Sequence, residues 1–138
     1  MDFERFTEKT KGFLQKAQTL AMRSRHQSLE PEHMLKVMLE DEDGAIQRLI
    51  QVAGGDSGRL KRDIEVALTK IPVVDGPGAG MLRFSTDLAR ILDNALMMAE
   101  KAGDKYVTAE RVLQSMLMAK KNDIGGYLEE AGLNDSAL

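Results

Sequence analysis

Apolar residues recur along this chain at intervals of three and four, the spacing that places them on one face of an α-helix. One such stripe comprises Phe6, Phe13, Leu14, Ala17, Leu20 and Ala21, and a second comprises Phe84, Leu88, Ile91, Leu92, Ala95 and Ala99. A residue favoured at helix N-caps, Thr7 or Ser85, stands at the start of each stripe. We therefore predict helices over about residues 7–24 and 85–102.

Shorter apolar stripes predict further helices. One begins at Pro31, because proline is tolerated at the first helical position, and another follows the cap residue Thr108. Helices are also expected over about residues 45–53, 123–131 and 56–71. No alternation of apolar and polar residues is long enough to predict a strand, since Val73-Val74 and Tyr106-Val107 are only short pieces.

The chain contains an internal repeat with an offset of 78 positions, the distance from Phe6 to Phe84. The alignment needs no gap as far as Gly54 on Gly132. Identical pairs along it include Leu14/Leu92, Ala17/Ala95, Ala21/Ala99, Glu32/Glu110, Leu35/Leu113, Met38/Met116, Leu39/Leu117 and Ile46/Ile124. Because the shared residues are mostly apolar and helically spaced, the repeat indicates a common packing template.

We predict an all-α fold in which two pseudo-symmetric four-helix repeats pack into one globular domain over residues 1–138. Repeat one spans 6–71, a linker rich in Pro and Gly spans 72–83, and repeat two spans 84–138. The cap candidate Asp56 aligns with Asn134, so the second repeat is cut within its last helix. We expect the chain to be a fragment of a longer protein.

Composition narrows the possible functions. Without cysteine there is no disulfide, thiolate nucleophile or thiolate metal site. A net charge of −3 argues against a general nucleic-acid binder, which normally has a basic face. We find no apolar run of membrane-spanning length and no signal peptide, so we expect a cytoplasmic protein with no membrane partner.

No pattern of catalytic or metal-binding residues emerges. The glycines of residues 76–80 lack the lysine and hydroxyl that a phosphate-binding loop requires. His26 and His33 are seven residues apart, unlike zinc ligands on one helix face, and we expect them at the surface or half-buried. The acidic run 40–43 lacks the alternating ligands of a calcium loop. We therefore predict no catalytic residue, metal or cofactor in this chain.

Several phrases of the sequence resemble the N-terminal domain of the Clp/Hsp100 AAA+ chaperones. In the first copy they are Phe6-Thr7-Glu8-Lys9, Ala17-Gln18-x-Leu20-Ala21 and Glu30-Pro31-Glu32-His33-Met34-Leu35. In the second they are Phe84-Ser85 and Ala99-Glu100-x-Ala102-Gly103-Asp104-x-Tyr106-Val107-Thr108-x-Glu110. The segment Ile71-Pro72-Val73-x-x-Gly76 is more similar to the ClpB disaggregase branch than to ClpA or ClpC.

The resemblance implies a domain that recruits misfolded or aggregated proteins to an ATP-dependent disaggregase, in a groove between the repeats. The residues matching client-handling positions are Thr7, Leu92, Asp104, Glu110, Arg111 and Val112. Arg111 stands where relatives can carry leucine, so we expect a less apolar groove on that side. ATP and magnesium belong to ATPase modules absent from this chain. The resemblance also implies a homohexameric parent, and we expect the isolated domain to be a monomer.

Other interpretations remain open at this point. Within the family, the domain could instead dock an adaptor for a ClpA/ClpC-type unfoldase that feeds a protease. Helix positions alone explain Thr7 and Glu110 as capping residues and Asp104 as a turn residue. A small hydrolase or metalloenzyme, and a DNA-binding helix starting at Pro31, are alternatives that metal analysis and a gel shift would test.

Overall fold

The structure, a computed structural model, describes residues 3–74, 82–119 and 123–134. Its elements in chain order are η1 (Phe3–Arg5), α1 (Glu8–Arg23), β1 (Ser28–Leu29), α2 (Pro31–Leu39), α3 (Ala45–Val52), α4 (Ser57–Thr69), β2 (Arg83–Phe84), α5 (Thr86–Lys101), α6 (Ala109–Leu117) and α7 (Ile124–Glu130). The predicted all-α class is confirmed. Most of the linker and the expected start of the last helix lie outside the described residues.

The helices α1, α4, α5 and α6 each begin at a residue whose side chain caps the first turn. The hydroxyls of Thr7, Ser85 and Thr108 and the carboxylate of Asp56 each accept a hydrogen bond from the backbone N–H three residues on. These bonds satisfy donors that the first helical turn would otherwise leave free. The cap residues thus fix the first turns of α1, α5, α6 and α4.

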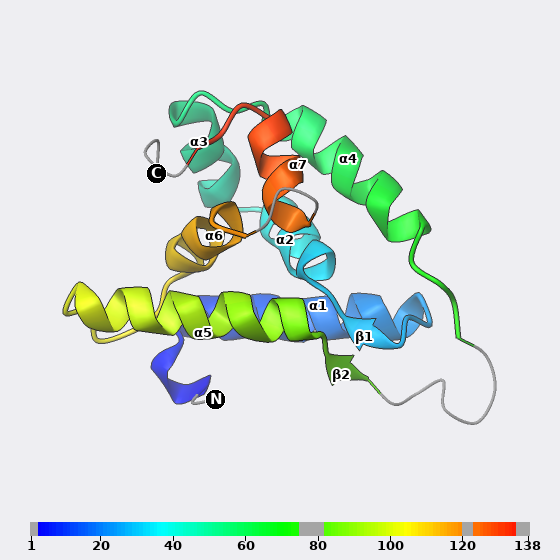
Figure 1. Cartoon of the computed structure of the whole chain (residues 1–138), viewed down its shortest axis with the longest axis horizontal. Coiled ribbons are helices and arrows are strands. Elements are labelled where there is room, and N and C mark those ends of the chain that lie inside the picture. Colours follow the sequence, from blue (N-terminus) through cyan, green and yellow to red (C-terminus); the bar gives the residue numbers. More distant parts are fainter. Residues whose placement is uncertain (1–2, 75–81, 120–122, 135–138) are drawn as a thin grey trace.

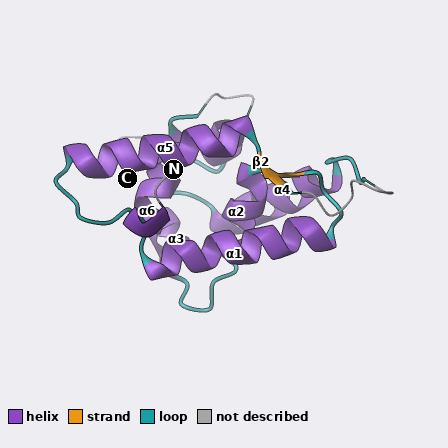
Figure 2. Ribbon diagram, turned by 90° about the horizontal axis from the view of Figure 1, so that it is seen from below, coloured by secondary structure: helices purple, strands orange, loops and turns teal. Residues whose placement is uncertain are grey.

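The long helices α1 and α5 run in opposite directions and lie apart, with α2 and α6 between them (Figures 1 and 2). Each packs against the second helix of its own copy, α1 on α2 and α5 on α6. On the far side of these pairs, α4 packs on α2 and α7 packs on both α6 and α4. The apolar stripes of both copies therefore meet in one shared core.

The two copies are joined by reciprocal backbone pairing that the sequence did not predict. β1 and β2 are parallel, with Leu29 opposite Phe84, and the N–H of Ser85 donates to the Leu29 carbonyl at 3.0 Å. Phe6 forms the equivalent parallel bridge with Val107, and the N–H of Thr7 donates to the Val107 carbonyl at 3.1 Å. Because both pairings obey the offset of 78, the copies are related by a pseudo-twofold axis.

A second junction lies where α4 meets the end of α7. The N–H of Asp56 donates to the Ala131 carbonyl at 2.8 Å. The preceding Gly55 approaches its neighbours so closely that a Cβ there would lie 2.9 Å from side-chain carbons of Ile50 and Leu133. A Cβ at this contact between the repeats would force these side chains to shift.

Candidate functional site

Three of the six predicted site residues line one open depression of about 490 Å³. We call this depression the polar face. Its lining residues are Asp104, Lys105, Tyr106, Thr108, Glu110, Arg111 and Gln114. The loop from α5 to α6 and the first turns of α6 supply these side chains. Gly103, with φ +76°, ends α5 in the left-handed conformation that glycine adopts easily and so begins the loop.

An ion pair organises the centre of the polar face. Nε and Nη2 of Arg111 donate to the same carboxylate oxygen of Asp104, at 3.1 and 3.0 Å. Nη1 of Arg111 also donates to Oε1 of Gln114 at 3.1 Å. Both charged side chains remain partly exposed, at 41% for Asp104 and 28% for Arg111, so the pair contributes at most about 1 kcal/mol to stability. Its main effect is to orient the guanidinium over the face.

Thr7 reaches the edge of this face from the other copy. Its N–H bonds to Val107, and the neighbouring Arg5 donates through Nε to the Lys105 carbonyl at 3.1 Å. The hydroxyl of Thr7 is already engaged with Thr10, whose hydroxyl lies 2.7 Å away. Thr7 therefore holds the loop and α1 together.

Leu92 and Val112 are both fully buried in the shared core. The expectation that they form an accessible apolar wall of the groove does not match their position. Both lie on stripes that pack α5 against α6, and such stripes face inward because burial of apolar area is the main favourable term in folding. Leu92 and Val112 therefore contribute to the core and are not accessible to a bound protein.

A second depression, of about 520 Å³, is lined by residues of both copies. We call it the seam groove, and its lining residues are Phe3, Glu8, Lys11, Gly12, Leu14, Gln15, Gln18 and Phe84. Phe3 and Phe84 meet edge to face with ring centroids 5.7 Å apart, and Phe3 remains 38% exposed. The carboxylate of Glu8, 2.7 Å from the Lys11 ammonium, raises the pKa of that lysine. The seam groove thus joins aromatic surface to charged side chains.

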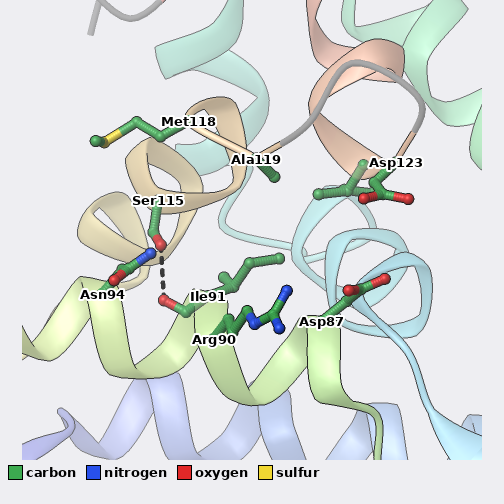
Figure 3. A pocket seen from close by; sticks show the side chains of 9 residues that line it. Asp87, Arg90, Ile91, Asn94, Ser115, Met118, Ala119 and Asp123 are labelled. Carbon is green, nitrogen blue, oxygen red and sulfur yellow. Dashed lines mark hydrogen bonds between the residues drawn. The ribbon is translucent and has the colours of Figure 1, made fainter.

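A third and smaller hollow, of about 140 Å³, lies between α5, α6 and α7 and belongs entirely to copy two (Figure 3). The Ser115 hydroxyl donates to the Ile91 carbonyl at 2.7 Å in its wall. The Arg90 side chain extends toward the side of the hollow where Asp87 and Asp123 lie. None of the predicted site residues lines it, so it does not match the groove expected between the repeats.

The two histidines were expected at the surface or half-buried, and this expectation is wrong. Nδ1 of His26 lies 2.7 Å from Nε2 of His33, and both side chains are buried. Nδ1 of His33 accepts the backbone N–H of Glu30 at 2.9 Å, so we assign its proton to Nε2, which donates to His26. Burial lowers the pKa of His26, and burial together with the charge of His26 lowers that of His33 to about 4.

Two glutamates near the junction of the copies, Glu30 and Glu32, have raised pKa values. Burial is the largest cause of the raised pKa of both Glu30 and Glu32, and the carboxylate of Asp87 adds to the effect on each. In the described ranges no group of three or more potential metal-ligating side chains is arranged to hold an ion. No helix there is long and apolar enough to cross a membrane.

Two exposed aromatic residues of these surfaces were not among the predicted site residues. Tyr106, on the polar face, is 47% exposed, and Phe3 lines the seam groove. Tyr106 stands in a family phrase and in an apolar piece too short to predict a strand, and Phe3 precedes the first helical stripe. Met97 on α5 and Met118, the C-cap residue of α6, are exposed as well.

Comparison with known proteins places these surfaces in a family context. Residues 5–131 match the model of the Clp repeat (R) N-terminal domain. The whole chain is 43% identical to the chaperone protein ClpB of Rhodopseudomonas palustris and 41% identical to that of Mesorhizobium japonicum. The chain spans 16% of the length of each of these relatives.

Solved structures share the fold at lower sequence identity. The N-terminal domain of Hsp104 from Candida albicans aligns with a TM-score of 0.82 at 23% identity, covering 96% of this chain and 85% of that one. A ClpV N-domain, solved as a complex with a VipB peptide, aligns with a TM-score of 0.79 at 17% identity, covering 97% and 82%. At these identities the likeness establishes the fold.

Proposed function

This chain belongs to the Clp repeat N-terminal domain family of Clp/Hsp100 chaperones, and we propose that it recruits unfolded or aggregated proteins. In this proposal it binds exposed apolar segments of such proteins at the seam groove and the polar face. A longer parent protein would then act on the captured chain in an ATP-dependent manner. The domain itself acts by binding and needs no cofactor.

The observation that carries this proposal is exposed aromatic surface, rimmed by charge, where the two copies meet. Phe3 and Tyr106 supply accessible rings, while Lys11, Glu110 and Arg111 lie on the linings of the same depressions. Exposed apolar surface with a polar rim is typical of protein-interaction sites. Partial exposure also suits weak and reversible capture, because a disordered chain loses entropy when it binds.

The relatives support binding as the role of this domain. The curated relatives are ClpB chaperones, and a ClpV N-domain of the same fold was solved with a VipB peptide. Assembly into a hexamer and hydrolysis of ATP are proposed for the parent, in the part of the relatives that this chain does not span. We propose a monomer for the isolated domain.

Anisotropy titration of fluorescently labelled casein, a permanently unfolded protein, tests the proposal. We expect saturable binding with a Kd on the order of micromolar or weaker, because ordering a flexible chain offsets much of the contact energy. Replacing Tyr106 by alanine should weaken binding roughly fivefold or more, since exposed aromatic anchors dominate many interfaces. Val66→Ala is the matched control, because Val66 is 53% exposed and belongs to α4, a helix that lies away from the α5–α6 loop (Figure 1).

The outcome also separates client capture from adaptor docking. Absence of casein binding, or equal binding by the wild type and the Tyr106→Ala variant, would contradict the proposal. If the domain instead retains one folded protein in stoichiometric amount and ignores casein, the adaptor-docking function is favoured.

A further inference from the structure

The two copies differ in what covers the turn after their first helix. In copy one the segment 72–74 lies along the turn at Arg25 and His26. Val73 forms an antiparallel bridge with His26, and the N–H of Val74 donates to the Arg25 carbonyl at 2.8 Å. The chain thus adds a short extended segment to its own turn.

The corresponding turn of copy two has the same backbone conformation. By the offset of 78, Arg25 and His26 align with Gly103 and Asp104. Arg25 and Gly103 are both left-handed, with φ of +56° and +76°. The N–H groups of His26 and Asp104 close the turn in the same way, each bonding at 2.9 Å to the carbonyl five residues back.

Even the side-chain pairs correspond. The buried hydrogen bond between His26 and His33 occupies the place that the ion pair between Asp104 and Arg111 occupies in copy two. In both copies a residue of the turn is tied to the third residue of the following helix. The two turns are therefore structurally equivalent. The segment that pairs with the turn of copy one indicates what kind of segment the turn of copy two can bind.

The turn of copy two is open in the described structure. His26 is 6% exposed, whereas the side chain of Asp104 is 41% exposed. The Gly103 carbonyl is the counterpart of the Arg25 carbonyl that accepts from Val74. Within residues 3–74, 82–119 and 123–134 this carbonyl accepts no hydrogen bond. An acceptor is thus available, in the right conformation, at the edge of the polar face.

We propose that an extended segment of a bound protein adds to the Gly103–Lys105 turn as a short antiparallel strand, in the way that residues 72–74 cover copy one. One N–H of the segment donates to the Gly103 carbonyl. Addition of a strand in this way recognises the main chain and tolerates varied side chains. The inference rests on the proposed function and specifies how the client is held.

The chemistry of the turn defines the segment that fits. A proline followed by β-branched residues favours extended backbone, as in Pro72-Val73-Val74 itself. The ring of Tyr106 offers apolar contact beside the turn. The charge of Arg111 is matched by Asp104, and the exposed Glu110 and Lys105 add one charge of each sign, so the face favours a neutral segment.

The chain supplies its own probe for the experiment. An acetylated, amidated peptide copying residues 70–74, Lys-Ile-Pro-Val-Val, is titrated into the ¹⁵N-labelled domain. We expect weak binding, with a Kd on the order of millimolar for so few contacts. The backbone amide signals of Gly103, Asp104 and Lys105 should shift with it.

Two methylated peptides make the test specific. Methylation of the second valine nitrogen, the counterpart of Val74, removes the N–H that would bond to Gly103. We expect about a fivefold or greater loss of affinity, in line with the loss of one hydrogen bond and the added methyl group. Methylation of the first valine, the counterpart of Val73, is the matched control. It should bind like the parent peptide, because the Val73 bridge forms through the flanking residues.

Equal affinities for the two methylated peptides, shifts confined to residues outside the turn, or no binding at millimolar concentration would each overturn the inference. Casein binding measured on the same sample keeps the two proposals apart. If casein binds with the expected dependence on Tyr106 while the peptides fail to discriminate, strand addition is wrong and client recruitment stands. If casein does not bind either, the proposed function itself fails.

Discussion

The buried histidine pair should make the stability of this domain sensitive to mild acid. Protonation of His33 at Nδ1 would remove the acceptor for the Glu30 N–H, and protonation of His26 at Nδ1 would place two N–H groups against each other. Neither imidazole can gain a proton at these atoms without losing a hydrogen bond. We therefore expect the folded state to keep the pair neutral at pH values where the unfolded chain is protonated.

The magnitude follows from the lowered pKa of His33. Between its pKa of about 4 in the folded state and 6.5 in the unfolded state, the unfolded chain binds more protons, so stability falls as the pH falls. At pH 5.0 the linkage relation predicts a loss of about 2 kcal/mol relative to neutral pH. The burial-raised pKa values of Glu30 and Glu32 act in the opposite direction, so the histidine contribution must be isolated by a variant.

His33→Gln provides that variant. His33 is the third residue of α2, where a glutamine side chain can also accept the N-cap backbone N–H, so the cap is retained while the titratable group is removed. Urea unfolding followed by far-ultraviolet circular dichroism would be measured at pH 7.5 and 5.0. The wild type should lose about 2 kcal/mol more than the variant on acidification. The reasoning is refuted if both proteins lose the same stability.

Three further substitutions test other parts of the structure by thermal unfolding. Arg25→Gly should stabilise the domain by roughly 0.5–1 kcal/mol, because Arg25 is the described non-glycine residue with positive φ; an unchanged or lower Tm would contradict this. Gly55→Ala should cost about 1–3 kcal/mol, because its Cβ would collide with Ile50 and Leu133, and a neutral effect would show that the junction adapts. Leu92→Ala should cost about 2–5 kcal/mol, as expected for a core leucine, whereas selective loss of casein binding at full stability would place Leu92 in an accessible groove.

Much of the fold was predictable because its determinants are local. The apolar stripes, the cap residues Thr7, Ser85, Thr108 and Asp56, and the glycines that end helices each act within a few residues. The repeat then doubled the evidence, because each stripe occurs twice. Helix bounds predicted from these signals agree with the structure to within one or two residues at the long helices.

The relation between the copies could not be predicted in this way. The bridges of Leu29 with Phe84 and of Phe6 with Val107 depend on how one repeat is turned against the other, which no local pattern specifies. The same is true of the contact between His26 and His33, since a turn brings together residues that linear spacing separates. Matching a family position likewise left open whether Leu92 faces a groove or the core. These contacts are tertiary, and they decide which predicted site residues are accessible.

Client recruitment is tested most directly by mapping where an unfolded protein contacts this domain. Amide chemical shifts of the ¹⁵N-labelled chain would be recorded during titration with unlabelled casein. We predict perturbations at the polar face, around Tyr106 and Glu110, and at the seam groove, around Phe3 and Phe84, so that both copies take part. Perturbations confined to the hollow around Arg90 or to α4, or no perturbation at saturating casein, would contradict it.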